Sequence, residues 1–175
     1  METAIKTKWS IDTAHSEVGF KVKHMMISTV KGHFDEYQAA IEASKDDFSD
    51  AKINFSAKTA SINTNNKDRD NHLRSDDFFN SNDYPEMTFT ATSFDGATLV
   101  GDLTIRDVTK EVTLHVDFNG IAVDPYGQTK AGFEISGEIN RKDFNLSWSA
   151  VTEAGSIVVA DTVKLVIDAQ FVKQA

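Results

Sequence analysis

A period of two in hydrophobicity runs through most of this chain. In residues 86–94, for example, Met87 and Phe89 alternate with threonines. Successive side chains of a β-strand point to opposite faces, so each such run predicts a strand with one apolar and one polar face. The runs cover residues 16–24, 32–43, 52–60, 86–94, 99–106, 111–118, 131–139 and 163–171.

Eight strands with one wet face predict an antiparallel sheet rather than a buried parallel one. Closure of that sheet into a barrel removes the edges that would pair with other chains. A two-sheet sandwich is the alternative architecture. In residues 32–43 Phe34 is out of phase with Tyr37 and Ile41, which predicts a bulge between them, and a short ninth strand is expected around Trp9 and Ile11.

The chain length suits one domain, residues 1–175. The formal charge of −9 opposes long-range attraction to nucleic acid and to anionic membranes, so we expect no nucleic acid partner and no stable membrane insertion, although a local basic patch would still attract an anion.

Cysteine is absent, which excludes disulfides and thiolate chemistry. The first residues lack an apolar run, so we expect a cytoplasmic protein, or a periplasmic or secreted one only if a signal has been removed ahead of Met1. Dimerisation is compatible with all of these features.

The alternation stops in one charged insertion at about residues 64–80. Residues 65–74 favour a short helix capped by Asn63, Thr64 or Asn65, and Ser75 predicts a second, single helical turn. Phe78 and Phe79 follow directly. The insertion is expected to fold back on the sheet, with its charges in water. The two aromatic rings then either cover one mouth of the barrel or simply fill its core.

Residues 140–160 alternate poorly and form the long connection before the last strand, which we expect to lie across a barrel end. Small residues fall on the inward rows and would leave space if they met at one level, although barrel taper and bending also use small residues. They are Ala57, Ala91, Gly101, Ala131, Gly137 and Ala169.

Several blocks of sequence resemble one family in the right order. They are Trp9–Asp12 with His15–Ser16, Phe20–Met25, Val30–Phe34, Arg69–Phe79 with Tyr84–Pro85, Gly101–Lys110 and Arg141–Phe144. Together they resemble the YceI-like polyisoprenoid-binding proteins across nearly the whole chain. The resemblance implies an all-β, eight-stranded antiparallel barrel of lipocalin-like form, which holds a long isoprenoid or fatty amphiphile without catalysis. Some members carry secretory signals, and because the first residues here lack an apolar run, we do not expect a periplasmic role.

We therefore expect a protein that binds or carries a polyisoprenoid, an isoprenoid quinone or a similar lipid, with no cofactor, no catalytic residue and no metal ligand. The candidates for an anionic head group are the cap residues Arg69, His72 and Arg74, which otherwise are solvated helix charges. The predicted ligand-binding residues are Phe20, Val22, His24, Met25, Phe34, Phe55, Leu73, Phe78, Phe79, Phe89, Leu103, Ile105, Leu114, Phe133, Ile135, Phe144 and Trp148.

Two further functions stay open at this point. One is an enzyme that acts on a small amphiphile near His24 or near Asp12 and His15, although these residues do not by themselves define a triad. The other is a structural or stress-associated barrel with a filled core. His15, His24 and His33 would hold a metal only if they converged in the fold, which their spacing does not decide.

Overall fold

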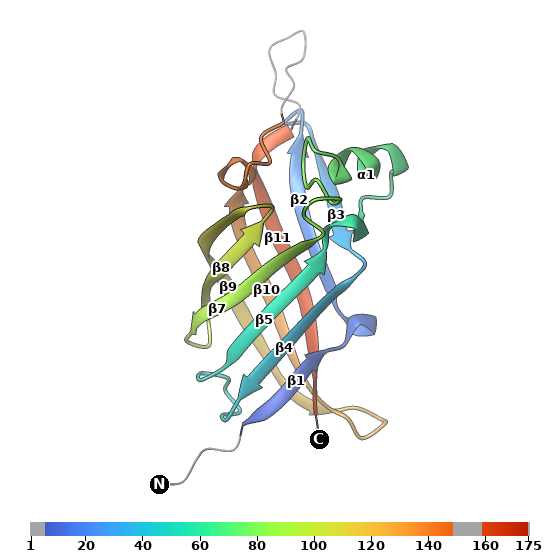
Figure 1. Ribbon diagram of the computed structural model, residues 1–175. Helices are drawn as coiled ribbons and strands as arrows, with labels where there is room; N and C mark the ends of the chain where they lie inside the picture. The colour runs from blue at the N-terminus through green and yellow to red at the C-terminus, as the bar shows by residue number, and fades with distance from the viewer. Residues whose placement is uncertain (1–5, 149–158, 175) are drawn as a thin grey trace.

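A computed structural model describes residues 6–148 and 159–174, and most of its regular structure is antiparallel β-sheet (Figure 1). It contains one α-helix, α1 (Lys67–Arg74), and three short 3₁₀ helices, η1 (Thr13–His15), η2 (Thr59–Ser61) and η3 (Arg141–Phe144). The strands are β1 (Thr7–Ile11), β2 (Glu17–His24), β3 (Ser28–Phe34), β4 (Tyr37–Ala43), β5 (Lys52–Lys58), β6 (Ile62–Asn63), β7 (Glu86–Phe94), β8 (Thr98–Ile105), β9 (Val108–Val123), β10 (Thr129–Asn140) and β11 (Val159–Lys173).

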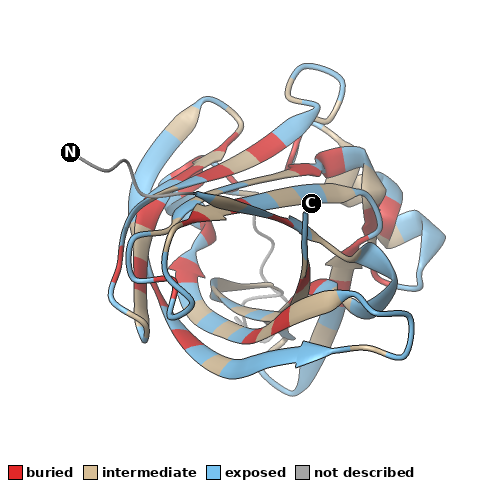
Figure 2. Cartoon of the chain, turned by 90° about the horizontal axis from the view of Figure 1, so that it is seen from below, coloured by how far each residue is buried: buried red, intermediate tan, exposed pale blue. Residues whose placement is uncertain are grey.

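The sheet closes on itself. Its ring runs β1, β4, β5, β7, β8, β9, β10 and β11, and β11 pairs back to β1 with Trp9 opposite Lys173. These are eight strands, so the predicted eight-stranded antiparallel barrel is confirmed and the sandwich is excluded. In Figure 2, which looks along the barrel from below, the strands form this ring with buried positions interspersed along them.

Three strands, β2, β3 and β6, extend the sheet beyond β11. β11 pairs with β1 near its C-terminal end and with β2 along the rest of its length, and β2 continues the sheet to β3 and β6. The predicted ninth strand is β1. The irregularity predicted between Phe34 and Tyr37 is a break at Asp35–Glu36, which separates β3 from β4.

The predicted helical insertion is present as α1, which lies beside the upper part of β3 (Figure 1). Its N-cap is Asn66, whose side chain accepts the Arg69 backbone N–H, rather than one of the three residues before it. The expected second helical turn is a hydrogen-bonded turn instead, in which the Phe78 N–H donates to the Ser75 carbonyl at 3.0 Å.

The insertion is also held from within. Asp70 is buried and accepts hydrogen bonds from the backbone N–H of Thr64 at 2.9 Å and from its hydroxyl at 2.5 Å. A buried carboxylate needs such partners, because burying one without a hydrogen bond lowers the stability of the fold by about 1–3 kcal/mol or more. This pair fixes the start of α1 against the strand that precedes it.

The two ends of the barrel differ, and we name them by their contents. The plug end is where the described termini lie in Figure 1, and the helix end is where α1, η3 and the β2–β3 turn lie. At the plug end the loop between β4 and β5 turns Phe48 into the barrel, where it is 1% exposed. We call the resulting cluster the aromatic plug: Trp9, Phe48, Phe118, Phe133 and Phe171.

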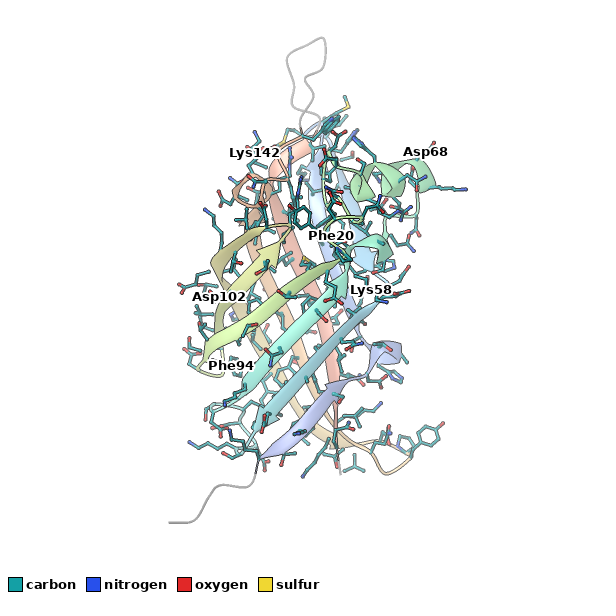
Figure 3. The ribbon with its side chains drawn as sticks, viewed as in Figure 1. Phe20, Lys58, Asp68, Phe94, Asp102 and Lys142 are labelled. Atoms are coloured by element: carbon teal, nitrogen blue, oxygen red, sulfur yellow. The ribbon has the colours of Figure 1, made fainter. Side chains whose placement is uncertain are left out.

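Most charged residues are exposed on the outside of the barrel. The labelled side chains of Lys58, Asp68 and Asp102 project from the outer surface in Figure 3, and all three residues are exposed. The apolar face of each strand therefore turns inward, as the alternation predicts.

Candidate functional site

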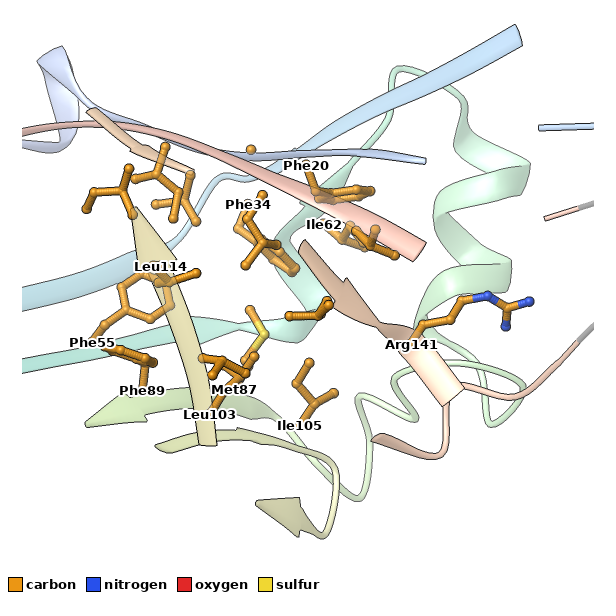
Figure 4. A pocket seen from close by; sticks show the side chains of 18 of the residues that line it. Phe20, Phe34, Phe55, Ile62, Met87, Phe89, Leu103, Ile105, Leu114 and Arg141 are labelled. Carbon is orange, nitrogen blue, oxygen red and sulfur yellow. The ribbon is translucent and has the colours of Figure 1, made fainter. Parts of the chain in front are cut away.

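An apolar cavity of about 200 Å³ lies inside the barrel. Side chains from opposite walls converge on it in Figure 4, among them Phe34, Leu103 and Leu114. Apart from Arg141, the residues that line it are apolar, and nearly all have aliphatic or aromatic side chains. Such a wall can exclude water and hold hydrocarbon, and it offers an incoming ligand dispersion contacts rather than directional hydrogen bonds.

Most of the predicted ligand-binding residues lie on this wall. They share inward positions on the strands or a place in α1 or in the turn that follows it. They are Phe20, Val22, Phe34, Phe55, Leu73, Phe78, Phe79, Phe89, Leu103, Ile105, Leu114 and Ile135.

Five predicted residues are not brought to the cavity wall. His24 ends β2 and pairs with Val159, and Met25 lies in the turn that follows. Phe133 belongs to the aromatic plug, where its ring stacks on Phe118 with centroids 5.1 Å apart. The other two are Phe144, which is buried in η3, and Trp148, which packs against His72 and Phe78.

The insertion supplies cavity wall and core together, so its two predicted roles do not exclude each other. Phe78 and Phe79 are 6% and 9% exposed and both line the cavity. The Phe79 ring meets Phe34 edge-on with centroids 5.9 Å apart. Arg106 holds the backbone beneath these rings by donating to the carbonyls of Asp76 and Phe78, each at 3.1 Å.

Arg141 is the lining residue that the sequence reasoning did not select. Its Nε donates to the Ala160 carbonyl at 2.9 Å, Nη1 donates to the carbonyls of Leu146 and Trp148, and Nη2 donates to that of Val159 at 3.3 Å. Figure 4 shows its guanidinium directed away from the cavity, so the methylene stem forms the wall.

The side chain of Arg141 is 3% exposed. Burial lowers the pKa of its guanidinium and the nearby Asp161 carboxylate raises it in part, but arginine stays charged in proteins. Its planar fork suits several acceptors at once, which a lysine could not match. Arg141 therefore ties the chain after η3 to the start of β11 at the helix end. Of the predicted long connection, residues 141–148 are described there and the last two residues belong to β11, whereas 149–158 lie outside the described residues.

The three head-group candidates all make contacts within the protein. Arg69 donates to the hydroxyl and carbonyl of Thr64, each at 2.7 Å, and Arg74 donates to Asn71 and Ala60. His72 shares a hydrogen bond of 2.8 Å with Asp77. None of the three is among the residues that line the cavity.

The small inward residues do not create the cavity as expected. Of the six, only Ala169 lines it. A Cβ at Gly101 would collide with the Phe89 ring, and one at Gly137 would collide with the Leu114 side chain. The glycines therefore make room for large neighbours across the strand pair, which is a packing role.

The three histidines do not converge. His15 Nδ1 is 2.8 Å from an Asp12 carboxylate oxygen, His33 Nε2 is 2.9 Å from one of Asp35, and His24 lies at the end of β2. Within residues 6–148 and 159–174 no group of three or more His, Asp or Glu side chains is placed to hold a metal ion. In the same residues no helix is long and apolar enough to cross a membrane.

The family model of the YceI-like domain matches residues 9–171 of this chain. Among curated proteins, UPF0312 proteins of Staphylococcus aureus and Staphylococcus epidermidis are 39% identical to it over 166 residues, which is 94% of this chain and 97% of theirs. The match thus extends over nearly the whole of both chains.

Among solved structures, the YCEI protein of Campylobacter jejuni superposes with a TM-score of 0.72 at 37% identity, covering 100% of this chain and 99% of its own. Burkholderia cenocepacia BcnA gives a TM-score of 0.77 at 21% identity, over 91% and 98% of the two chains. A polyisoprenoid binding domain from Saccharophagus degradans gives 0.72 at 15% identity, over 95% and 98%. The last two likenesses concern the fold.

Proposed function

Because the chain belongs to the family of YceI-like domains, we propose that it binds or carries a long-chain apolar amphiphile inside the barrel, without converting it chemically. The ligand class is a polyisoprenoid, an isoprenoid quinone or a similar lipid, and residues 1–175 act as one lipid-binding domain. The observation that carries this proposal is the cavity of about 200 Å³ with its aliphatic and aromatic wall. The polyisoprenoid binding domain of Saccharophagus degradans, which has the same fold, supports the ligand class.

The energetics favour the tail of the ligand as its main point of attachment. Each five-carbon isoprene unit contributes at most roughly 3–4 kcal/mol, at about 0.8 kcal/mol per buried CH₂. Ordering of the ligand offsets part of this gain. A few units therefore give tight binding, and the head group needs only to be accommodated at the end of the barrel.

The cavity volume indicates how a long chain would enter. A dry apolar cavity of about 150 Å³ accepts benzene, whereas pockets for drug-sized ligands start at about 300 Å³. At about 200 Å³ the cavity holds part of a long chain as it stands, and a longer one needs the wall to move. The covering side chains Leu73, Phe78 and Phe79 belong to the insertion and not to the hydrogen-bonded ring, so we propose that they shift first.

Binding without catalysis is supported by the chemistry of the wall. Among the described lining residues Arg141 alone has an ionisable side chain, and its N–H groups donate to backbone carbonyls. General acid–base chemistry needs a titratable group within hydrogen-bond reach of the substrate.

We propose that the twelve predicted residues on the wall contact the apolar tail. Of the head-group candidates we retain His72, because its ring packs edge-on against Phe78 with centroids 5.1 Å apart, and Phe78 lines the cavity. Arg69 and Arg74 use their guanidinium groups to hold α1 and its surroundings.

The test is organic extraction of gently purified protein followed by mass spectrometry, together with uptake of added polyprenols. The matched pair of variants is Val163→Phe, which fills the cavity, and Val166→Phe, which places the same ring on the outer face of the same strand. We expect the first to lose lipid and the second to keep it. Repeated absence of lipid with no polyprenol uptake would favour the filled structural barrel, and turnover of the amphiphile would favour the enzyme.

A further inference from the structure

The turn between β2 and β3 exposes two large apolar side chains. Met26 is 64% exposed and Ile27 is 82% exposed, and the Ile27 N–H donates to the His24 carbonyl at 3.2 Å. Met25 and Met26 have φ angles of 52° and 59°, a conformation that glycine and asparagine adopt far more readily. The turn thus holds bulky apolar groups in water at a backbone cost, and neither Met26 nor Ile27 packs against the described core.

Lysines gather on the outer face beside this turn. Lys164 of β11, Lys21 of β2 and Lys31 of β3 lie directly across from one another on adjacent strands. Lys23 lies two positions nearer the turn. Like charges directly opposite in a sheet are destabilising, so the row costs stability.

All four lysines face outward, because they alternate with inward positions such as Phe20 and Val22, which line the cavity. Glu138 of β10 lies opposite Lys164 and offsets part of the positive charge of the row. Lys21 and Lys31 have no acidic residue opposite them in the strand register. Lys23 faces the irregular stretch of β11 between Val159 and Val163, where Asp161 forms an ion pair with Lys142.

Acidic residues occupy the same wall farther from the turn. Asp117, Glu134, Asp168 and Glu17 lie across from one another on β9, β10, β11 and β2. Glu17 precedes Lys21 by four residues, a separation of about 13 Å at roughly 3.3 Å per residue. Exposed charges are screened over about 8 Å at physiological salt. The helix end of this wall is therefore locally positive although the chain carries a net charge of −9.

We propose that this part of the molecule docks on the surface of a membrane rich in anionic phospholipid. The docking surface consists of Met26 and Ile27 at the turn and of Lys21, Lys23, Lys31 and Lys164 on the adjoining strands. The hairpin lies obliquely on the bilayer, with the turn entering the boundary between head groups and acyl chains and the lysines facing phosphates. Both parts of the surface suit this partner: apolar side chains at the tip and cations behind them.

The docking surface adjoins the wall of the cavity. Val22 lines the cavity and lies four residues from Met26, and His24 pairs with Val159, another lining residue. Docking would place the helix end of the barrel against the bilayer, so that an apolar molecule could pass between the two without crossing bulk water. The inference goes beyond the proposed function, because docking belongs to the outer surface and does not depend on what the cavity holds.

The test is sedimentation of the full chain with vesicles. One set consists of phosphatidylcholine alone and the other of equal parts phosphatidylcholine and phosphatidylglycerol. We expect binding to the second set, weakened by added salt, and little binding to the first. Equal partitioning onto both sets, or no binding to either, would overturn the proposal, whatever the extraction experiment finds in the cavity.

Charge variants test the lysine row. Lys21→Gln combined with Lys31→Gln is expected to weaken binding to the anionic vesicles roughly fivefold for each lysine, since a basic residue near such a surface contributes about 1 kcal/mol. The same change removes a repulsive cross-strand pair, so the melting temperature should not fall. Lys8→Gln combined with Lys173→Gln is the matched control at the plug end, with two exposed lysines and the same loss of charge. Equal losses for the two variants would exclude a specific surface.

A second variant separates docking from folding at the turn. Met26→Gly places glycine where φ is 59°, so it should stabilise the fold while it removes apolar surface. Combined with Ile27→Thr, it should weaken vesicle binding about tenfold, which corresponds to a loss of about 1.4 kcal/mol of apolar burial. Unchanged binding by this more stable variant would contradict a role for the turn.

Discussion

The two ends of the barrel are closed in different ways. At the plug end, rings fill the interior: Phe48 has Trp9, Phe118 and Phe133 around it with centroids 5.2 to 5.4 Å apart. At the helix end, hydrogen bonds from Arg106 and Arg141 hold the covering segments in place. The apolar interior beneath these segments is incompletely filled. Aromatic packing uses up volume, whereas hydrogen bonds at the rim leave volume free for a ligand.

The largest effect is expected from Phe48→Ala. The Phe48 side chain is almost fully buried among other aromatic rings, which cannot collapse onto the space it would leave. The free energy of unfolding should therefore fall by about 5 kcal/mol, at the upper end of values for Phe→Ala. Urea unfolding measures it. Lipid affinity per folded molecule should stay unchanged, and a marked loss of affinity would mean that the plug also shapes the cavity.

Arg141→Met should destabilise the helix end by about 4 kcal/mol, because it leaves several backbone carbonyls without their charged donor. Methionine keeps the apolar stem. Lys142→Met, at the exposed neighbouring position, is the control and should change stability little. If both variants unfold at the same urea concentration, the guanidinium does not hold this end.

Phe79→Ala compares the helix end with Phe48→Ala directly. The ring borders an existing cavity, so its removal should cost about 3 kcal/mol, the lower end of the range for Phe→Ala. It should also change how long lipid is retained, which a dissociation-rate measurement reports. A stability loss as large as that of Phe48→Ala with unchanged retention would make Phe79 a core residue alone.

The smallest effect concerns the ion pair of Asp12 with Lys130. Hydrogen bonds from Lys130 and then from His15 lower the pKa of Asp12 to about 2 from 3.8, so the folded state favours its ionised form. The lowered pKa adds up to about 2 kcal/mol to the free energy of unfolding. This stabilisation is complete above about pH 4 and is lost as the pH falls toward 2. Asp12→Asn should flatten the acid limb of a plot of unfolding free energy against pH. An identical acid limb in the variant would remove Asp12 from that account.

The same contrast explains how far the sequence alone could lead. Alternation identified most of the strands, although it joined parts of β3 and β4 into one run and missed β6, and polar composition identified the insertion that became α1, because both depend on neighbours in the chain. Alternation also selected nine residues of the cavity wall, since inward parity is a local property, and the insertion supplied the other three, Leu73, Phe78 and Phe79. Phe48 was missed because it stands alone in a polar loop, and only the tertiary fold brings it into the barrel.

Arg141 was missed for a related reason. Its acceptors are backbone carbonyls of segments up to 19 residues away, and backbone carbonyls leave no mark in a sequence. The small inward residues misled the prediction, because a glycine in a strand makes room for a neighbour across the pair as readily as for a ligand. Phe133 has the correct inward parity, yet it lies at the level of the plug, which parity cannot reveal.

The pairing of β1 with β11 has a consequence for how the molecule forms. Trp9 and Lys173 lie opposite each other although almost the whole chain separates them. The ring cannot close until the last strand is available, and contacts of such long sequence separation make folding slow. During synthesis the first strand must therefore wait for its final partner, and a truncation of only a few residues at the C-terminal side would remove the three residue pairs between β1 and β11 and leave the ring open at the plug end.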